Sequence, residues 1–542
     1  MSEVTHFFNK EKFYLKTFSK SELYKVFDNG IYPKEKIENN RLIDYLYEYF
    51  TDQSSGSDSK SMHAKTILVE EEYLSESYLN DIRVHYWNTY RDYNKFCRRL
   101  HFFNEKISKQ DFVNKVLEKD KSFFNKTYLG YVIIKPTGNS LFGPTFLKVF
   151  ESNSEKQRCY NSILKMTINL FGINIDIEGL IFQEQDKAIG VCATQAIWSA
   201  MNKLSYLFRI PMLSPSEISS YGGISSANGR IFPNSGLSNK QIFKVFEKNS
   251  LTVELMSLSK SGQNKMDKNL FKQIVYAYNK VGIPILLGYY AYNTKNKKSD
   301  KRKQRHIVTI VGYRLDKKDI NKNRSTFNLK TVADRILRLY VHNDQIGPYT
   351  KIGFDEGENN SPYVIQTNWI GTKFEDVIYD SLLVPVKKYI RIRYHNVSAA
   401  INKLDEPIIE AFSQINVELE WDIYLDKGTN YKRDILDTKI KNSDKIQIIT
   451  ESFPKYIWIA RLRSYSNDKE SKVELDIIYD SSESPSNFCL HRVYFFNREI
   501  GKTLVKILDN ETNSLWKLLY DRISDQHINF LKSELKKMEY EY

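Results

Sequence analysis

The middle of the chain shows helical patterns first and strand patterns afterwards, and this order strongly limits the possible folds. "ATQAIWSAMNKL" and "LSNKQIFKVFEKN", the latter behind a capping Ser238, place apolar residues at helical spacing. "IPILLGYY", "HIVTIVGYR" and "LRLYVHND" are short apolar runs of the kind that form buried strands. We therefore predict an α+β fold in which a helix packs on an antiparallel sheet.

The length of the chain predicts more than one domain. Its 542 residues exceed what one core holds, while 41% hydrophobic and 14% aromatic residues are enough to fill several cores. We expect an N-terminal mixed α/β region over residues 1–150 and a core over residues 151–393. Residues 394–542 should form a β-rich domain, with the strands "KYIWIARLRSY" and "KVELDIIYD" and a terminal helix in "SLWKLLYDRISDQHINFLKSELKKM".

Several classes of protein are disfavoured by composition. No stretch approaches the roughly 20 apolar residues that span a bilayer, and the charged N-terminus does not resemble a secretory signal, so we expect a cytoplasmic protein without a membrane span. The four cysteines (Cys97, Cys159, Cys192 and Cys489) are scattered, without the spacing of a zinc site or a disulfide framework. We expect no metal and no organic cofactor.

The net charge of +14 raises the question of an anionic partner. Most lysines alternate with acidic residues, as on ordinary solvated faces. The exception is "NTKNKKSDKRKQRH", Asn293 to His306, where seven basic residues accompany one acid. This loop would attract an acidic protein or peptide substrate, although a solvated loop is the commoner meaning of such a run. Nucleic acid is a conceivable partner, but no nucleic-acid-binding motif supports it.

Cys192 begins the helical run "CATQAIWSAMNKL". The free N–H groups and positive dipole end of a helix start favour an anion and would stabilise a thiolate. A thiolate attacks acyl carbons readily, whereas a thiol does not. The competing interpretation is a small buried apolar side chain, the usual role of an intracellular cysteine.

Two further residues complete a pattern with Cys192. His306 opens the strand run "HIVTIVGYR", where a rigid element would hold an imidazole in place as a general base. Asp344 follows the next strand run, before a Gly-Pro turn, and could orient that imidazole. Taken singly, each has an ordinary explanation, as a surface histidine and as a turn aspartate.

The order of cysteine at a helix start, histidine on a strand and aspartate after the next strand resembles the papain-like cysteine peptidase superfamily. Within it, the bacteriocin-leader peptidases look closest, because their third member is an aspartate. The resemblance covers about residues 175–390. It implies a papain-like core in which Cys192 is the nucleophile, His306 the base and Asp344 the orienting residue.

The resemblance also implies a glutamine upstream of the cysteine as an oxyanion donor. Gln185 fits best, and Gln183 competes with it. Strand alternation sends Asn343 and Asp344 to opposite faces, so only one of them should easily reach His306, and we prefer Asp344. Asn368 is a more distant alternative, and Trp369 should be a core residue. The chain departs from the family in Ala193 after the nucleophile, in a longer spacing from Gln185 to Cys192, and in a charged insertion after "HIVTIVGYR".

The expected activity is a cysteine peptidase-like hydrolase that cleaves an amide or isopeptide bond through a Cys-His-Asp triad. An acyltransferase or transglutaminase-like enzyme would use residues in the same order. An inactive peptidase-like binding protein with a basic surface is the alternative outside the enzymes.

Overall fold

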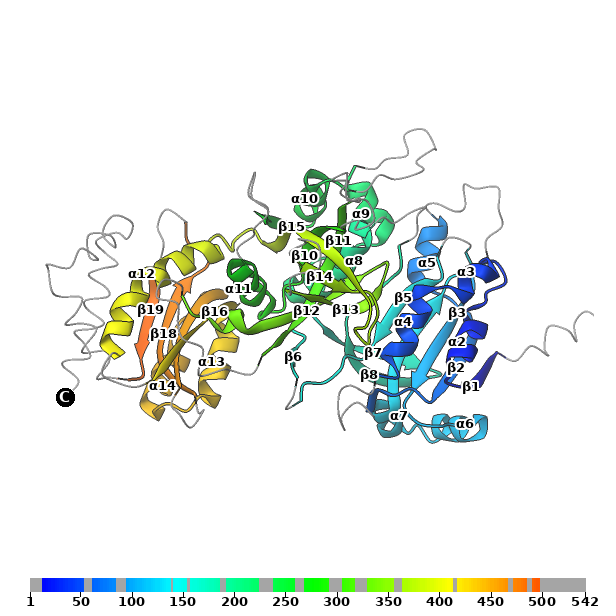
Figure 1. The fold of residues 1–542 in the computed structure, drawn as a ribbon. Helices are drawn as coiled ribbons and strands as arrows, with labels where there is room; N and C mark the ends of the chain where they lie inside the picture. The colour runs from blue at the N-terminus through cyan, green and yellow to red at the C-terminus, as the bar shows by residue number, and fades with distance from the viewer. Residues whose placement is uncertain are drawn as a thin grey trace, which may run out of the picture. The chain divides into compact units, whose positions relative to one another are not determined.

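The computed structural model describes residues 12–52, 61–83, 94–137, 140–153, 156–185, 192–223, 237–258, 268–291, 305–316, 329–354, 363–412, 417–465, 471–484 and 490–497. Over these ranges the chain forms mixed helix and strand structure, as the α+β prediction requires (Figure 1). It divides into two compact units. Unit 1 consists of Met1–Met266, Gly282–Leu315 and Leu337–Pro385, and unit 2 of Asp267–Val281, Asp316–Ile336 and Val386–Tyr542.

Unit 1 begins with an antiparallel sheet in the order β1-β2-β3-β4-β5. Its strands are β1 (Phe13–Thr17), β2 (Thr66–Tyr73), β3 (Cys97–Phe103), β4 (Tyr128–Ile134) and β5 (Phe142–Leu147). All seven residues of β4 are buried. β1 lies at one edge of the sheet and pairs with β2 from Phe13↔Glu70 to Thr17↔Thr66.

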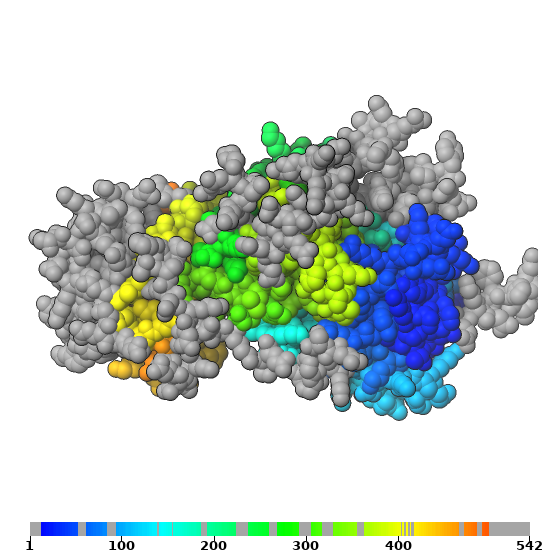
Figure 2. All heavy atoms as spheres, in the orientation of Figure 1, coloured from blue at the N-terminus to red at the C-terminus, as the bar shows by residue number. Residues whose placement is uncertain are grey.

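Helices cover both faces of this sheet. Neighbouring residues of a strand point to opposite faces, so each strand can pack against helices on both. On one face Phe102 packs 4.8 Å, centroid to centroid, from Phe50, which directly follows α4. On the other face Phe103 meets Phe112 of α6 and Phe124 of α7. The helices of this region are α2 (Lys20–Phe27), α3 (Lys34–Glu38), α4 (Arg41–Tyr49), α5 (Glu76–Asp81), α6 (Lys109–Leu117) and α7 (Lys121–Thr127). In the space-filling view these blue and cyan residues form one packed body (Figure 2).

The second sheet of unit 1 closes on itself. Its strands run in the order β10-β11-β12-β13-β14-β15, and β10 also pairs with β15. Their bounds are β10 (Ile285–Ala291), β11 (Arg305–Leu315), β12 (Ile336–Asn343), β13 (Gly347–Gly353), β14 (Tyr363–Gln366) and β15 (Phe374–Lys387). The antiparallel sheet that the sequence predicts is thus a closed barrel, because the long β15 pairs with β14 on one side and with β10 on the other. Further strands are β6 (Gln157–Cys159), which pairs with β11, β9 (Leu251–Ser257), which pairs with β15, and the hairpin of β7 (Leu164–Leu170) and β8 (Ile173–Gly179).

Three helices accompany the barrel: α8 (Cys192–Phe208), α9 (Pro215–Tyr221) and α10 (Asn239–Lys248). α8 contacts β11 and β10. α10 begins behind Ser238, whose hydroxyl accepts from the Gln241 N–H in a capping box, as predicted.

Unit 2 is built on an antiparallel sheet in the order β16-β17-β18-β19. Its elements are α11 (Lys268–Asn279), η3 (Val332–Arg335), α12 (Tyr394–Phe412), β16 (Glu418–Lys427), α13 (Gly428–Asp437), α14 (Asn442–Thr450), β17 (Tyr456–Tyr465), β18 (Ser471–Asp480) and β19 (Leu490–Phe495). The predicted strands "KYIWIARLRSY" and "KVELDIIYD" are β17 and β18. The terminal helix predicted near the end of the chain lies outside the described residues.

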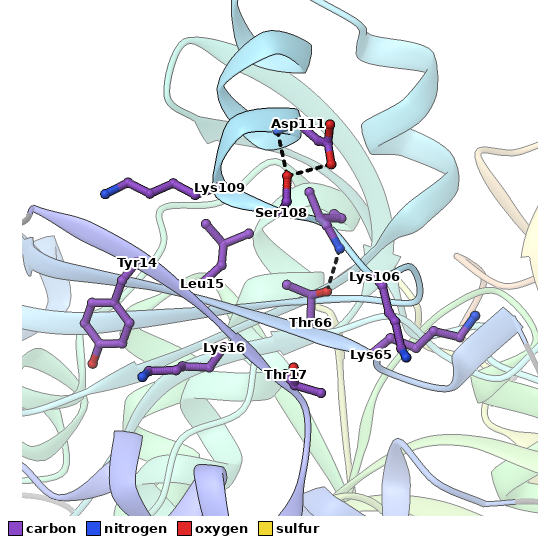
Figure 3. A pocket seen from close by; sticks show the side chains of 11 residues that line it. Tyr14, Leu15, Lys16, Thr17, Lys65, Thr66, Lys106, Ser108, Lys109 and Asp111 are labelled. Carbon is purple, nitrogen blue, oxygen red and sulfur yellow. Dashed lines mark hydrogen bonds between the residues drawn. The ribbon is translucent and has the colours of Figure 1, made fainter.

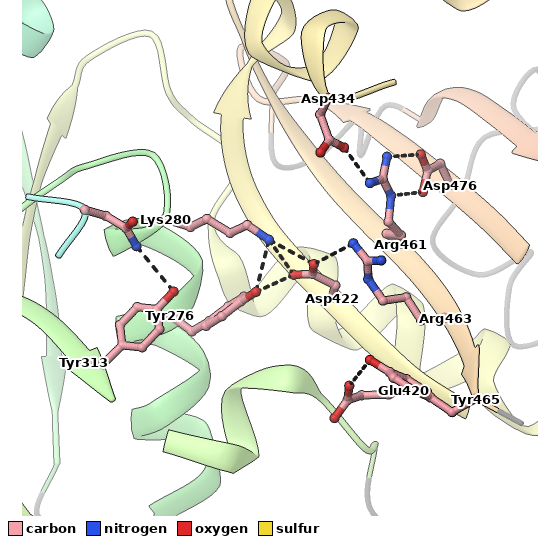
Figure 4. A network of polar contacts seen from close by, with 11 residues as sticks. Tyr276, Lys280, Tyr313, Glu420, Asp422, Asp434, Arg461, Arg463, Tyr465 and Asp476 are labelled. Atoms are coloured by element: carbon pink, nitrogen blue, oxygen red, sulfur yellow. Dashed lines mark hydrogen bonds and ion pairs between the residues drawn. The ribbon is translucent and has the colours of Figure 1, made fainter. Parts of the chain in front are cut away.

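One face of this sheet carries buried charges (Figure 4). Asp422 contacts Lys280 at 2.9 Å, and Arg461 contacts Asp476 at 2.8 Å. Burial and ion pairing occur together here, which satisfies charges that would otherwise be costly inside the fold.

The charged insertion after β11 contributes to unit 2 where it is described. Thr331 forms a parallel bridge with Trp421, and the Trp421 N–H donates to the Lys330 carbonyl at 2.9 Å. The insertion exceeds the length of a hairpin loop because part of it extends the core around β16.

Candidate active site

Cys192 is the first residue of α8 and is partly exposed. The residues from Ala193 to Met201 are all buried, and the apolar residues at helical spacing in α8 are 5% exposed or less: Ala196, Ile197, Ala200, Met201 and Leu204. A helix buried in this way has a fixed position, so the thiol at its start has one as well.

A hydrogen bond joins α8 to β11 close to the thiol. The Thr309 hydroxyl in β11 donates to the Ala196 carbonyl at 2.7 Å. Ala196 lies one helical turn after Cys192, and Thr309 lies three residues after His306. This bond therefore fixes the register in which the cysteine and the histidine face each other.

His306 lies between the thiol and two polar side chains. Its ring is hydrogen-bonded to the Cys192 side chain. On the other side, His306 Nε2 is 3.0 Å from Asp344 Oδ1 and 3.3 Å from Asn343 Oδ1. Because Nε2 faces these two oxygens, Nδ1 is the ring nitrogen left for the thiol. The structure thus brings together Cys192, His306 and Asp344, the three residues expected to form a triad.

The expectation that only one of Asn343 and Asp344 reaches His306 is wrong. Strand alternation does not apply to this pair, because the β12–β13 register shifts between Val341 and Asn343 and β12 ends at Asn343. Asp344 belongs to the following turn and points to the same side as its neighbour. Asn343 Oδ1 and Asp344 Oδ1 therefore both contact Nε2.

The surroundings of His306 favour its charged form. Burial, the largest influence, acts to lower the pKa of the ring, but Tyr289, the Asp344 carboxylate and the hydrogen bond with Cys192 together raise it well above its ordinary value. Asp344 is 5% exposed, and among the described residues its carboxylate is paired with His306 alone. A buried carboxylate with a single cationic partner strongly stabilises the protonated form of that partner.

Tyr289 is a neighbour of the histidine that the sequence analysis missed. It stands opposite His306 in the β10–β11 register, and the two rings are 5.3 Å apart, edge to face. Its hydroxyl accepts from Asn343 Nδ2 at 2.8 Å, which fixes the direction of the amide. The sequence did show an aromatic residue in the strand run before that of His306. It did not show the register that places the two residues opposite each other.

The two glutamines expected as oxyanion donors lie on either side of an anchored residue. The Glu184 carboxylate accepts from the backbone N–H groups of Leu141 and Phe142 at 2.8 and 3.0 Å. Gln183 is 2% exposed and, among the described residues, its Oε1 has no hydrogen-bond partner, whereas Gln185 is partly exposed. Both remain candidates for the oxyanion donor.

His342 fixes the backbone just before Gln183, at Ile181, and is not a second base. The Ile181 carbonyl accepts from the Ser199 hydroxyl at 2.8 Å and from His342 Nδ1 at 3.2 Å. Burial lowers the pKa of His342 to about 3, so its ring is neutral. These bonds connect α8, β12 and the segment that precedes Gln183.

The remaining predicted residues lie elsewhere. Asn368 bonds to Thr372 and Glu48, so it belongs to a turn and not to the histidine site. Trp369 is 1% exposed and is a core residue, as predicted. The basic loop lies outside the described residues except for His306 and Arg305, and the Arg305 guanidinium pairs with Asp380 at 2.7 Å.

The other cysteines have different surroundings. Cys97 is buried, and burial raises the pKa of its thiol to about 12. Cys159 is partly exposed in β6, and Cys489 lies outside the described residues. In the part of the chain that the structure covers, no group of three or more His, Cys, Asp or Glu side chains is placed to hold a metal ion. None of the helices described there combines the length and apolar composition of a membrane span.

A thiol, an imidazole and a carboxylate in this order can carry out nucleophilic attack on an acyl carbon. Comparisons with protein-family models, curated proteins and solved structures find no match to this chain. The functional argument therefore depends on the geometry of the site.

Proposed function

We propose that the protein is a cysteine-dependent acyl hydrolase with a papain-like core, acting on an amide or isopeptide bond of a protein or peptide. One observation carries the proposal: the buried His306 ring lies between the Cys192 thiol on one side and Asn343 and Asp344 on the other. A helix that starts with the thiol and packs on the antiparallel strand bearing the histidine supports the likeness to papain-like enzymes.

In the first half of the reaction, the Cys192 thiolate attacks the acyl carbon while His306 holds the proton as imidazolium. The tetrahedral intermediate collapses as the C–N bond breaks, and His306 gives its proton to the leaving amine. A thioester to Cys192 and a free amine result.

In the second half, neutral His306 takes a proton from water, and the hydroxide attacks the thioester carbon. The C–S bond breaks, the carboxylic acid leaves, and the thiolate is restored beside the protonated imidazole. Asn343 and Asp344 keep the ring oriented throughout, and Asp344 also stabilises its positive charge. The Cys192 backbone N–H and the amide of Gln185 or Gln183 would stabilise the oxyanion.

The thioester intermediate provides the test. The protein is mixed with p-nitrophenyl acetate, nitrophenolate release is followed by stopped flow, and acid-quenched samples are mapped by peptide mass spectrometry. We expect a burst of one equivalent, with the acetyl group on Cys192. Cys192→Ala should abolish the burst, and Cys159→Ala, the matched change at another partly exposed cysteine, should retain it.

The release step separates hydrolysis from acyl transfer. If water is the acceptor, acetate forms at a rate that added methylamine does not change. Formation of N-methylacetamide as the main product would indicate an acyltransferase. A folded protein that gives no burst, or equal acetylation of Cys159 and Cys192, would contradict the proposed function.

A further inference from the structure

An open pocket lies at the edge of the N-terminal sheet, separate in sequence from the residues around Cys192 (Figure 3). Its volume is about 880 Å³. Its walls come from β1, from the start of β2, and from the segment between β3 and the first turn of α6. The lining residues are Tyr14, Leu15, Lys16, Thr17, Lys65, Thr66, Lys106, Ile107, Ser108, Lys109 and Asp111.

The lining carries four lysines and one acidic residue. The acidic residue, Asp111, is already engaged, because its carboxylate accepts from the Ser108 hydroxyl at 2.6 Å. The pocket therefore has a net charge of about +3 at neutral pH.

Three of these lysines have no carboxylate partner among the described residues: Lys16, Lys65 and Lys106. Other lysines of the same region do have one, such as Lys20 with Asp44 at 2.7 Å and Lys115 with Asp120 at 2.9 Å. Acidic residues are common in this chain, which has 66 of them. Ammonium groups that line one pocket without acidic partners repel each other. A bound anion would remove this repulsion.

We propose that this pocket binds a ligand with several phosphate groups. Lysine is a common phosphate ligand, because its ammonium offers a compact charge and three rotatable donors. In Figure 3 the ammonium groups of Lys16 and Lys109 extend to one side of the pocket and those of Lys65 and Lys106 to the other. The charges lie on two sides of a space of about 880 Å³, which one phosphate would not fill, so a polyphosphate chain or successive phosphates of a nucleic-acid strand match it better.

The site is independent of the proposed hydrolase chemistry, since none of its lining residues belongs to the histidine site. A single-stranded oligonucleotide labelled with fluorescein is the first probe, and inorganic tripolyphosphate is the competitor. Lys16→Gln, Lys65→Gln and Lys106→Gln are combined in one variant. The matched control combines Lys34→Gln, Lys36→Gln and Lys126→Gln, which removes the same charge from exposed lysines outside the pocket.

We expect the pocket variant to bind the oligonucleotide at least about tenfold more weakly and the slope of log affinity against log salt to fall by about 2, since each phosphate contact with a single strand contributes about 0.7. The control variant should bind as the wild type does. Competition by tripolyphosphate would identify a polyphosphate-type ligand, and its failure to compete would identify an extended strand.

Three results would overturn the proposal. The first is the absence of binding to either probe at low salt. The second is an equal loss in the pocket and control variants, which would assign binding to the overall charge of +14. The third is displacement of the oligonucleotide by a polyglutamate peptide as readily as by tripolyphosphate. Thermal unfolding and the nitrophenolate burst, measured on the same variants, show that the fold and the histidine site are intact.

Discussion

His306 has a structural role as well as a chemical one. It is 7% exposed, and its ion pair neutralises Asp344, which is 5% exposed. Replacing a surface histidine would change the stability of the fold little. Replacing His306 leaves the buried Asp344 carboxylate without its charged partner. The choice of substitution therefore decides whether a loss of activity can be interpreted.

We predict that His306→Ala destabilises the protein by about 3–5 kcal/mol, the range for breaking a buried ion pair on one side. Combining it with Asp344→Asn should restore part of that loss, because the second change removes the unpaired charge. Chemical denaturation of the wild type, both single variants and the double variant measures this coupling. Additive losses would show that the two side chains do not interact.

The raised pKa of His306 also predicts a pH dependence of stability. Below about pH 6.5 both the folded and the unfolded histidine are protonated, so the stabilisation is fully present. Above that pH the unfolded state releases its proton first, and the stabilisation falls by about 1.4 kcal/mol per pH unit until the pH passes the raised folded pKa. The difference in unfolding free energy between the wild type and His306→Gln should therefore narrow as pH rises above about 6.5. A constant difference would show that the pKa of His306 is not raised.

Alkylation should distinguish Cys192 from the other cysteines. An imidazolium generally favours the thiolate form of a cysteine beside it, and the His306 ring contacts the Cys192 side chain, whereas burial raises the pKa of the Cys97 thiol to about 12. At mildly acidic pH iodoacetamide should label Cys192 first, and His306→Gln should slow this labelling. Peptide mass spectrometry over time gives the order. Labelling of Cys159 at the same rate as Cys192 would indicate an ordinary thiol.

Tyr289 should act as a positioning residue. Tyr289→Phe removes the hydroxyl that accepts from Asn343 Nδ2 but keeps the ring against His306. The loss of one hydrogen bond, worth about 1 kcal/mol, should slow alkylation of Cys192 about fivefold and shift its pH profile. Tyr290→Phe, the neighbouring change, is the control. A purely structural role would lower the thermal unfolding midpoint and leave the pH profile unchanged.

At the scale of elements, the contact of α8 with β11 decides whether the thiol meets the imidazole. The helix supplies Cys192, the strand supplies His306, and the hydrogen bond from Thr309 to Ala196 sets their alignment. Thr309 and Ala196 are both buried, so this hydrogen bond lies inside an apolar contact where water does not compete with it.

Thr309→Val keeps the shape of the side chain and removes this link. The Ala196 carbonyl would then lose a buried partner, and we expect a loss of about 1–3 kcal/mol in stability together with slower alkylation of Cys192. Thr350→Val is a suitable control, because the Thr350 hydroxyl is also buried but bonds locally to Gly347 in β13. Equal effects of the two variants on alkylation would mean that Thr309 does not align the site.

The sequence predicted the elements of the site better than their contacts. The strand runs ending at Asn343 and beginning at His306 are β12 and β11, because apolar β-branched residues identify buried strands without knowledge of the register. The register shift before Asn343 could not be foreseen, because it depends on pairing with β13 and not on local composition. For the same reason the partnership of Tyr289 with His306 was missed.

At the scale of the whole molecule, the chain passes between its two units several times. Asp267–Val281 and Asp316–Ile336 join unit 2, although the first lies in sequence between β9 and β10 and the second between β11 and the body of β12. Such assignments depend on contacts between residues far apart in sequence, and neither hydrophobic period nor turn residues report these contacts. Closure of the barrel has the same origin, since it requires β10 and β15 to meet.

Asp422 in β16 is the centre of a charged group within unit 2 (Figure 4). The group joins the segment Asp267–Val281 to the segment Val386–Tyr542. Its carboxylate accepts from Lys280 Nζ at 2.9 Å and from the Tyr276 hydroxyl at 2.8 Å, and it lies 3.6 Å from the Arg463 guanidinium. Burial acts to raise the pKa of Asp422, but Lys280 and Arg463 lower it overall. The stabilisation is therefore present above about pH 3.9 and is lost as pH falls through the lowered pKa.

We predict that Asp422→Asn destabilises unit 2 by up to about 3 kcal/mol, the low end for a broken buried pair, because Lys280 and Arg463 keep partial exposures of 28% and 24%. Asp437→Asn, at an exposed position of the same unit, should have little effect. Hydrogen exchange read by peptide mass spectrometry should show faster exchange in β16 and β17 of the Asp422 variant. Alkylation of Cys192 should be unchanged, because Cys192, His306 and Asp344 all belong to unit 1. Slower alkylation together with faster exchange in β11 would instead show that the histidine site depends on the charged group of unit 2.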